Sequence, residues 1–558
     1  MAKLKGSTFL AQTFLKADVG AIFFVPTFLY PTLVELGGTG VRRVLCHAEK
    51  AAAYMADGYS QAAGKPGIVI TQGGPGAVNL ASGFGDPWQS GSSVIGLTSL
   101  IPVTRYRRNS YQEVYVDFRP VTKYDAEVRS LDRLPDILGQ AFREATTGAT
   151  GPAHLYVAGG IEAEEIETPE FMEPRYTRYP AFRPQADERD VEAAARRLRE
   201  AQRPVIVAGR GAIRSGAWAE VTALAEKFHI PVATSLGGKG SIDEKHPLAI
   251  GVVGSYRRPA TNTVVGKADL VLFVGSHVGG AIVNMRECPP WGTPIIHIDI
   301  DPAQPGKNYP DVTPLIGDAR AVLQQMLEAT DKAPADAHAA WIAEAQATIR
   351  DWWAKENAHV TADAAPIRPE RLAVELVKAV PNDTIVVVDT GYAAAWGGAF
   401  MDLPAGKNFL ACEGSMGWSF PAAIGAKCGA PERPVVTWVG DGGFWCHLPE
   451  LETAVRYGIK VVTVVMNNHA LVFDTHLLQH FWSGSAHIDE LSEFRDVDFG
   501  AVAREMGAYG VRVTDPRNIS SAIQKALAAE GPAVIDFVID HEAIAPVAVL
   551  AGQASRAR

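Results

Sequence analysis

The sequence predicts an α/β protein made of three doubly wound parallel-sheet domains, and three observations support this prediction. The chain has 558 residues, too many for one hydrophobic core at roughly 100–200 residues per domain. Short apolar runs alternate with Ala-rich helical patterns along most of the chain, as expected for parallel sheets covered on both faces. Two segments that are poor in core-forming residues divide this alternation into three blocks.

The first predicted domain spans residues 1–165. Its strand candidates include 67–71 and 93–97, and an Ala-rich helical pattern covers 47–63. Residues 161–187 are acidic and rich in Pro, a composition typical of a linker.

The second predicted domain spans residues 188–330 and is Rossmann-like. Its strand candidates are 204–209, 230–234, 268–274 and 294–300. The segment Gly209-Arg-Gly211 lacks the third glycine of the dinucleotide fingerprint, so we interpret it as a plain strand-to-helix turn. An Ala-rich helical segment over 331–364 leads out of this block.

The third predicted domain spans residues 366–545 and repeats the rhythm of the first; a short tail, 546–558, follows. Its strand candidates are 384–389, 434–438, 460–465 and 532–537.

Composition excludes several classes of protein. The formal net charge is −10 with no basic block, so nucleic acid is not expected as a partner. No apolar run approaches the roughly 20 residues that cross a bilayer. Five scattered cysteines without a Cys-x-x-Cys pair are typical of a reducing compartment. We therefore expect a cytoplasmic, multi-domain enzyme.

The most informative motif is Gly440-Asp441-Gly442-Gly443, which follows one predicted strand, whereas Asn467-Asn468 ends the next. Backbone amides of a Gly-rich turn at the carboxyl edge of a sheet bind phosphate oxygens. A carboxylate and a carboxamide at the same edge suit Mg²⁺. Alone, Gly-Asp-Gly is a turn and Asn-Asn a helix cap. The 27-residue spacing from Asp441 to Asn468 fits one crossover helix and a return strand, and favours a shared site.

This pattern resembles the signature of thiamine-diphosphate-dependent enzymes, specifically the group of acetolactate synthase, pyruvate decarboxylase and pyruvate oxidase. The resemblance covers nearly the whole chain and includes the segment 413–426. It implies that the three domains are a pyrimidine-binding, a central and a diphosphate-binding domain. It also implies that Asp441, Asn468 and the Ala470 carbonyl hold Mg²⁺, and that Gly442, Gly443 and Thr390 lie near the diphosphate.

A second motif, Cys46-His-Ala-Glu49, follows a strand-like run in the first domain. In the resembled family a glutamate at this place hydrogen-bonds N1′ of the cofactor pyrimidine, which creates an internal base beside a weakly acidic carbon. Glu49 is therefore the predicted catalytic residue. Taken alone, it would be a first-turn glutamate that complements a helix dipole.

Further matches to the family extend the predicted site. The likeness implies that Gly74, Pro75 and Asn79 pack beside the pyrimidine, that Met416 props the cofactor in its bent shape, and that Gln112 faces the reacting carbon. The family also implies a homodimer or homotetramer with sites between subunits.

Departures from the family bear on the reaction. The acid that pyruvate decarboxylases carry near the start is replaced by Phe28, and their His-His pair is missing. Thr27, Phe28 and Leu29 are expected to line an apolar substrate pocket. On the other side, Asp474 or His476 is either an acid/base residue or a solvated polar residue.

We therefore expect a lyase or carboligase that resembles acetolactate synthase, with thiamine diphosphate and Mg²⁺ as cofactors and small carbonyl compounds as substrates. The alternative is a 2-hydroxyacyl-CoA lyase or oxalyl-CoA decarboxylase that takes CoA esters. A 2-oxo acid decarboxylase and a non-catalytic homologue are less favoured. FAD or another nucleotide in the central domain stays open, as does a covering role for the tail after Ala543.

Overall fold

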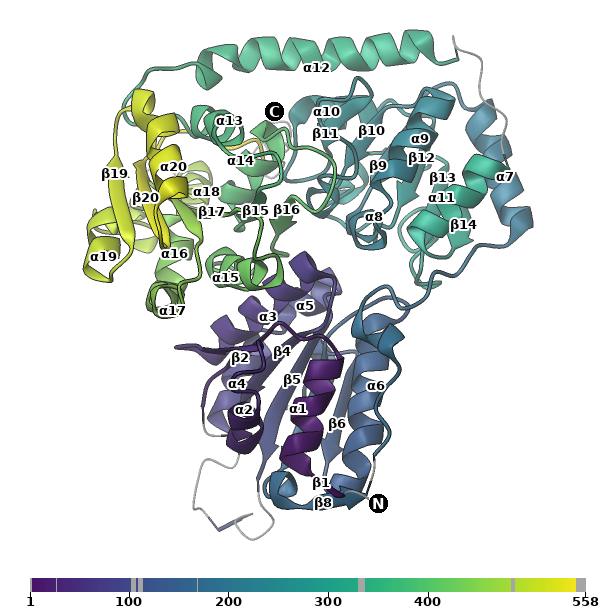
Figure 1. Ribbon diagram of the computed structural model, residues 1–558. Helices are drawn as coiled ribbons and strands as arrows, with labels where there is room; N and C mark the ends of the chain where they lie inside the picture. Colours follow the sequence, from purple (N-terminus) through teal and green to yellow (C-terminus); the bar gives the residue numbers. More distant parts are fainter. Residues whose placement is uncertain are drawn as a thin grey trace.

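The computed structural model describes residues 3–26, 28–101, 107–108, 114–167, 169–329, 337–482 and 487–547. These residues form three lobes, each built around a parallel six-stranded sheet with helices on both faces (Figure 1). The predicted fold class is confirmed. None of the helices within these ranges is long and apolar enough to cross a membrane.

The first lobe has the strand order β3-β2-β4-β5-β7-β6. Its strands are β2 Ala21–Phe24, β3 Arg42–Leu45, β4 Gly67–Thr71, β5 Val94–Leu100, β6 Tyr124–Val128 and β7 Ala153–Ala158. Its helices are α1 Gly6–Lys16, α2 Tyr30–Glu35, α3 Glu49–Ala63, α4 Pro75–Ser82, α5 Gly85–Ser90 and α6 Leu134–Thr146. Two short strands, β1 Lys3–Lys5 and β8 Glu165–Glu167, pair antiparallel beside it.

The central lobe has the order β11-β10-β9-β12-β13-β14, that of a dinucleotide-binding Rossmann sheet. Its strands are β9 Pro204–Ala208, β10 Val232–Thr234, β11 Ala249–Val252, β12 Leu270–Val274, β13 Ile295–Asp299 and β14 Val312–Ile316. Its helices are α7 Glu188–Glu200, α8 Arg210–Ser215, α9 Trp218–Phe228, α10 Pro259–Val265 and α11 Ala319–Glu328. As predicted, Gly209 lies in the turn between β9 and α8.

The third lobe has the order β16-β15-β17-β18-β20-β19. Its strands are β15 Ile385–Val388, β16 Phe409–Ala411, β17 Val435–Gly440, β18 Val462–Asn467, β19 Tyr509–Val513 and β20 Ala533–Val538. Its helices are α13 Pro369–Ala379, α14 Tyr392–Phe400, α15 Ser419–Gly429, α16 Asp441–His447, α17 Glu450–Arg456, α18 Val472–Trp482, α19 Phe499–Glu505 and α20 Ile519–Ala528.

The first and third sheets have the same strand order. In each, the second strand in sequence lies at one edge beside the first, and the third strand returns to the other side of the first. This reversal opens a crevice at the carboxyl ends of the first and third strands, where ligands of open α/β sheets bind. The crevice lies between β2 and β4 in the first lobe and between β15 and β17 in the third.

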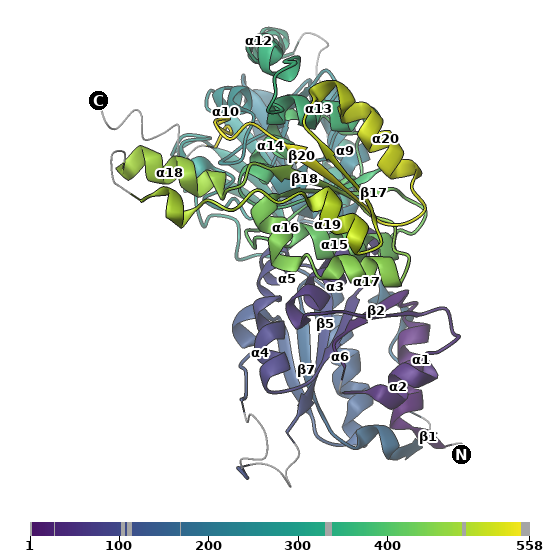
Figure 2. The same cartoon turned by 90° about the vertical axis from the view of Figure 1, so that its left-hand side faces the viewer.

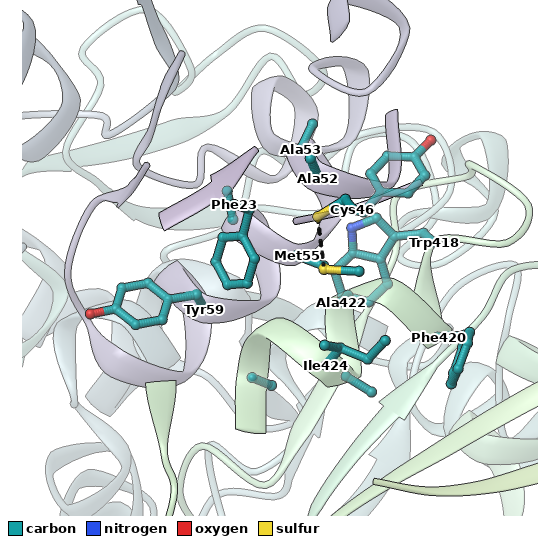
Figure 3. Close-up of a cluster of buried hydrophobic side chains, with 14 of the residues drawn as sticks. Phe23, Cys46, Ala52, Ala53, Met55, Tyr59, Trp418, Phe420, Ala422 and Ile424 are labelled. Carbon is teal, nitrogen blue, oxygen red and sulfur yellow. Dashed lines mark hydrogen bonds between the residues drawn. The ribbon is translucent and has the colours of Figure 1, made fainter. Parts of the chain in front are cut away.

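Helices α3 and α15 join the first lobe to the third (Figure 3). Each is the helix that follows the second strand of its own sheet. They cross in backbone contact at Gly58 and Gly425, and Met55, Trp418 and Ile424 pack around the crossing in one buried cluster. A buried hydrogen bond of 2.9 Å from the Trp418 indole to Asp57 adds to the contact.

The central and third lobes are joined by buried polar contacts and by α12, Ala339–Val360, which runs across the top of both (Figure 1). Arg258 donates to the Ala399 carbonyl and to Asp402, and its guanidinium lies near the rings of Trp352 and Trp353 on α12. These contacts fix the position of the central lobe beside the third.

The predicted boundaries differ from the structure at three places. Strand β8 extends the first domain beyond residue 165, because its pairing with β1 draws part of the supposed linker into that lobe. Strand β10 begins at Val232, directly after Pro231, rather than at 230. Helix α12 begins at Ala339, after a segment that lies outside the described residues.

Candidate active site

A cavity of about 280 Å³ lies at the carboxyl ends of the third sheet. Its wall is formed by the turns that follow β15, β17 and β18, three neighbouring parallel strands. The sequence predicted that Asp441 and Asn468 meet at one sheet edge, and both line this cavity together with Thr390, Gly442, Gly443 and Ala470.

Asp441 is the first residue of α16, and its side chain is buried. One carboxylate oxygen accepts the backbone amide of Gly442 at 2.7 Å. The other accepts the amides of Asn468 at 3.1 Å and Ala470 at 3.2 Å. Burial raises the pKa of Asp441 to about 6 despite these bonds. The turn after β18 is thereby tied to the turn after β17.

The two asparagines have different roles. Asn467 points into the fold, where its amide group donates to Asp536 at 2.9 Å and to the Val497 carbonyl at 3.0 Å. Asn468 lines the cavity beside Asp441, and its carbonyl accepts a bond from His541. A carboxylate, a carboxamide and the nearby Ala470 carbonyl form a set of hard oxygen donors, which fits Mg²⁺.

Glycines give the cavity the shape of a phosphate cradle. A β-carbon on Gly391 or Gly440 would meet no atom within 4 Å, so the backbone there faces open space. A β-carbon on Gly442 would approach Leu471 to 2.5 Å, and one on Gly443 would approach Val439 to 2.9 Å. Gly391, which has a positive φ, is the N-cap of helix α14, and the N-terminus of this helix lines the same cavity.

Asp389, which the sequence analysis did not single out, organises the opposite wall. Its carboxylate accepts the amides of Thr390 and Gly417 at 3.0 Å, and both the amide and the hydroxyl of Ser419 at 2.9 and 2.7 Å. Burial raises its pKa. Asp389 could have been identified from the sequence, because it is a polar residue directly after an apolar strand that ends at the same sheet edge.

Met416 lines the cavity and is 41% exposed. A methionine that only fills core space would be buried. Its exposure at the cavity is consistent with the predicted role as a prop for the cofactor, which stays a prediction.

Glu49 is the first residue of α3 and is buried beside α4. Its carboxylate accepts a hydrogen bond of 3.1 Å from Asn79, and a β-carbon on Gly76 would lie 3.2 Å from the same group. Gly74, with a positive φ, is the N-cap of α4, and Pro75 is the first residue of this helix. The structure thus brings together four of the residues predicted in the first domain, Glu49, Gly74, Pro75 and Asn79. None of them lines the cavity at Asp441 within the chain.

Asp474 and His476 on α18 differ in their surroundings. Asp474 is exposed and lines the cavity. His476 is buried, and its Nδ1 shares a hydrogen bond of 2.7 Å with the Tyr392 hydroxyl. Burial lowers the pKa of His476, which favours the neutral imidazole. Of the two, only Asp474 meets the cavity directly.

The predicted substrate-pocket residues are placed in part. Phe28 and Leu29 are buried in the hydrophobic core of the first lobe, among Ile22 and Leu33. Thr27 and Gln112 lie outside the described residues. The expected pocket at this place stays a prediction.

A second cavity of about 900 Å³ lies at the crevice of the central sheet. Its wall includes Arg210, Ser276 and Asp299 of the central lobe. Tyr256 and Thr390 line both this cavity and the one at Asp441, so the two cavities share a wall.

Comparison with known protein families gives three matches, which follow one another along the chain as an N-terminal, a central and a C-terminal domain. Residues 4–119 match the N-terminal thiamine pyrophosphate (TPP) binding domain of thiamine pyrophosphate enzymes. Residues 191–326 match the central domain of these enzymes, and residues 389–537 match their C-terminal TPP binding domain. Glu49, Asp441 and Asn468 lie inside the two TPP-binding matches.

The chain is also similar to curated proteins over nearly its full length. It is 31% identical to a probable acetolactate synthase large subunit of Methanocaldococcus jannaschii, with 98% of this chain and 93% of that protein covered. It is 27% identical to the acetolactate synthase large subunit of Haemophilus influenzae, over 99% and 97% of the two chains. It is 28% identical to a putative thiamine pyrophosphate-containing protein, YdaP, of Bacillus subtilis, over 91% and 86%.

Proposed function

Because the chain belongs to the thiamine-pyrophosphate-dependent enzymes, we propose that it is a carboligase or lyase of the acetolactate synthase type. It forms or cleaves a carbon–carbon bond beside the carbonyl group of a small 2-oxo acid. The observation that carries this proposal is the glycine-lined cavity in which Asp441, Asn468 and Ala470 gather at one sheet edge. The similarity to acetolactate synthase large subunits supports the choice of reaction.

Mg²⁺ fits the oxygen donors at this edge. The Asp441 carboxylate, the Asn468 side-chain oxygen and the Ala470 carbonyl would hold the ion. The amides of Gly442 and Gly443 and the N-terminus of α14 would face the diphosphate. A β-carbon on Gly442 or Gly443 would meet Leu471 or Val439, so glycine is required at both positions. Thiamine diphosphate, when bound, supplies a nucleophilic carbon that adds to carbonyl groups.

Glu49 holds a proton at the pyrimidine nitrogen in this proposal. A carboxyl group buried beside Asn79 is placed to share a proton with a ring nitrogen. Met416 props the cofactor from the opposite wall, and Gly74 and Pro75 let the backbone of α4 approach it closely.

A second copy of the chain completes the site. Glu49 does not line the cavity at Asp441 of its own chain, although both groups must act on one cofactor. We therefore propose a homodimer, or a tetramer of two such dimers, in which the first domain of one subunit faces the third domain of its partner. A cytoplasmic location accords with the scattered, unpaired cysteines.

In this proposal the second carbonyl substrate, the acceptor, binds near Gln112 and Asp474. The residues around Thr27, Phe28 and Leu29 complete this part of the site. Asp474 is the acid/base candidate on α18 because it lines the cavity. His476 acts through its bond to Tyr392 instead of meeting the substrate.

An alternative is a lyase or decarboxylase of 2-hydroxyacyl-CoA or oxalyl-CoA esters. The large cavity in the central lobe favours it, since about 900 Å³ next to the site would hold a nucleotide such as the adenosine diphosphate part of CoA, or FAD. Its crevice at the switch point of a Rossmann order supports nucleotide binding of either kind.

The test is an assay of the purified protein with thiamine diphosphate and Mg²⁺ against pyruvate, other 2-oxo acids, aldehydes and 2-hydroxyacyl-CoA esters. We expect acetolactate-type condensation of 2-oxo acids, and loss of turnover in Asp441→Asn and Glu49→Gln. Cleavage of CoA esters without condensation would establish the alternative. Failure to bind thiamine diphosphate in calorimetry would contradict both and leave a non-catalytic homologue.

A further inference from the structure

Two buried carboxylates outside the cavity hold the backbone that leads into the proposed cofactor-contacting residues. Glu450 on α17 is 1% exposed. One of its oxygens accepts the amides of His47 at 3.0 Å and Ala48 at 3.2 Å, and the other accepts the Thr453 hydroxyl at 2.7 Å. Glu49 is the next residue along the chain. The third lobe therefore binds the backbone of the first lobe at the turn before Glu49.

Helix α3 obtains no cap from its own sequence. Its N-cap residue is Ala48, which has no side-chain oxygen to offer the first turn. Glu450 supplies a carboxylate at this end from another domain, where negative charge is favoured. The Tyr457 hydroxyl accepts the amide of Leu45 at 3.0 Å and holds the same segment.

The first lobe makes the reciprocal contact on the third. Asp86 on α5 is 3% exposed. Its two oxygens accept the amides of Glu413 at 2.5 Å and Ser415 at 3.2 Å. Met416 is the next residue along the chain, and its side chain lines the cavity at Asp441.

These two contacts involve equivalent elements of the first and third lobes, which have the same strand order. Helices α5 and α17 each come after the third strand of their sheet and before the fourth. The turns that they grip each come between the second strand and the helix α3 or α15. Each carboxylate therefore reaches across the α3–α15 crossing to the corresponding turn of the other lobe.

We propose that Glu450 and Asp86 are a reciprocal pair of positioning residues, each fixing from one domain the backbone that aims Glu49 or Met416 of the other. This inference rests on the proposed function, in which Glu49 and Met416 contact thiamine diphosphate. Neither Glu450 nor Asp86 lines the cavity, so both act through the residues that they hold.

The geometry predicts that replacing the carboxylate by a carboxamide has a different effect at Glu450 than at Asp86. Glu450 uses a single oxygen for both backbone amides, so Glu450→Gln keeps these bonds and turns its NH₂ group to the Thr453 oxygen. Asp86 uses both oxygens, one for each amide, so Asp86→Asn places an NH₂ group against a backbone N–H. An unpaired buried donor is costly, whereas a retained bond is nearly neutral.

The first experiment is amide hydrogen exchange on the protein without cofactor. Glu450→Ala should speed exchange in residues 45–49 by about tenfold or more, and Asp86→Asn should do so in residues 413–416. Glu450→Gln should match the unaltered protein. The matched control is Glu452→Ala, because Glu452 lies on the same helix, has a side chain that is 45% exposed, and bonds the His47 ring instead of the backbone. Unchanged exchange in Glu450→Ala and Asp86→Asn would overturn the inference.

The second experiment measures exchange of the thiazolium C2 proton of bound thiamine diphosphate. In Glu450→Ala this rate and kcat should fall on the order of 100-fold, while KM for the 2-oxo acid changes little, because misplacement affects the reacting geometry. Glu450→Gln should restore both. Faster amide exchange with unchanged C2 exchange and kcat would leave Glu450 a merely structural residue and overturn the proposal.

Two further variants distinguish failure of this inference from a failure to fold and from failure of the proposed function. Should Glu450→Ala fail to fold, Tyr457→Phe removes the acceptor for Leu45 at the same segment and takes its place in both experiments. Glu49→Gln tests the proposed function alone: if it leaves C2 exchange unchanged, Glu49 has no role in proton transfer. The amide-exchange results without cofactor would still stand in that case.

Discussion

Gly58 of α3 lies against the backbone of Ala422 in α15, so closely that a β-carbon on Gly58 would stand 1.9 Å from the Ala422 carbonyl oxygen. The contact is repeated in reverse, because a β-carbon on Gly425 would stand 1.8 Å from the Met55 carbonyl oxygen. The two helices approach this closely because each places a glycine against the backbone of the other. This crossing determines how the first and third lobes pack together. It therefore also determines how Glu450 and Asp86 reach the turns that they bind in the opposite lobe.

Gly58→Ala should lower the free energy of unfolding by about 3 kcal/mol, the upper range for overpacking, because the added methyl group meets backbone and not a flexible side chain. Chemical denaturation measures the change. The control is Gly85→Ala in α5, where a β-carbon meets no atom within 4 Å. Equal effects at the two positions would show that the crossing tolerates a methyl group.

Lys239→Met should destabilise the protein by about 3–5 kcal/mol, because it leaves Glu244 buried without its partner. The two side chains form an ion pair of 2.6 Å and are almost fully buried, and Glu244 also accepts the Leu403 amide at 2.9 Å. Lys239→Met with Glu244→Gln should cost less than Lys239→Met alone, since the amide keeps the Leu403 bond. Denaturation curves of the single and double variants measure this, and additive losses would contradict it.

Met416→Ala should change the free energy of unfolding by no more than about 0.5 kcal/mol, as for most partly exposed positions. In contrast, kcat should fall on the order of 100-fold if the side chain holds the cofactor in its reactive shape. Leu15→Ala on α1, with 40% exposure, is the control for loss of an exposed apolar side chain. A loss of stability with unchanged kcat would assign Met416 to packing.

Acid should weaken the fold through His447. Burial lowers the pKa of this imidazole from 6.5 to about 4. Between these values the unfolded chain binds a proton that the folded chain does not, so stability is complete above pH 6.5 and falls as the pH drops toward 4. The contribution is about 3 kcal/mol at most. Urea unfolding at pH 7 and pH 5 should show a smaller loss for His447→Phe, which keeps an aromatic ring beside Tyr54; an equal loss would contradict the assignment.

Subunits that carry Glu49→Ala and Asp441→Ala should complement each other. Each variant alone is inactive, but a mixed dimer regains one intact site, made from Glu49 of one chain and Asp441 of the other. Dimers purified through two different tags should have about half the activity of the unaltered protein, because a two-fold assembly has two equivalent sites. Inactive mixed dimers would place both groups in one chain.

Much of the fold follows from local pattern. The runs that became β4, β12, β15 and β18 are short, apolar and bounded by polar or Gly residues, which predicts buried strands without knowledge of their neighbours. The meeting of Asp441 and Asn468 was predictable for the same reason, since the carboxyl ends of adjacent parallel strands share an edge.

Other features depend on contacts between lobes and have no local signal. Glu450 and Asp86 lie in ordinary helical sequence, and their partners are 403 and 327 residues away. Asn467 and Asn468 are neighbours of the same type, yet only the packing of Asp536 beneath Asn467 separates a structural side chain from one at the cavity. Strand order could not be inferred either, because it depends on long-range pairing.

The common strand order of the first and third lobes has a consequence for the history of this polypeptide. A sheet order repeated in full, with matching glycines at the crossing and matching acids that reach over it, is the pattern that duplication of one ancestral domain would leave.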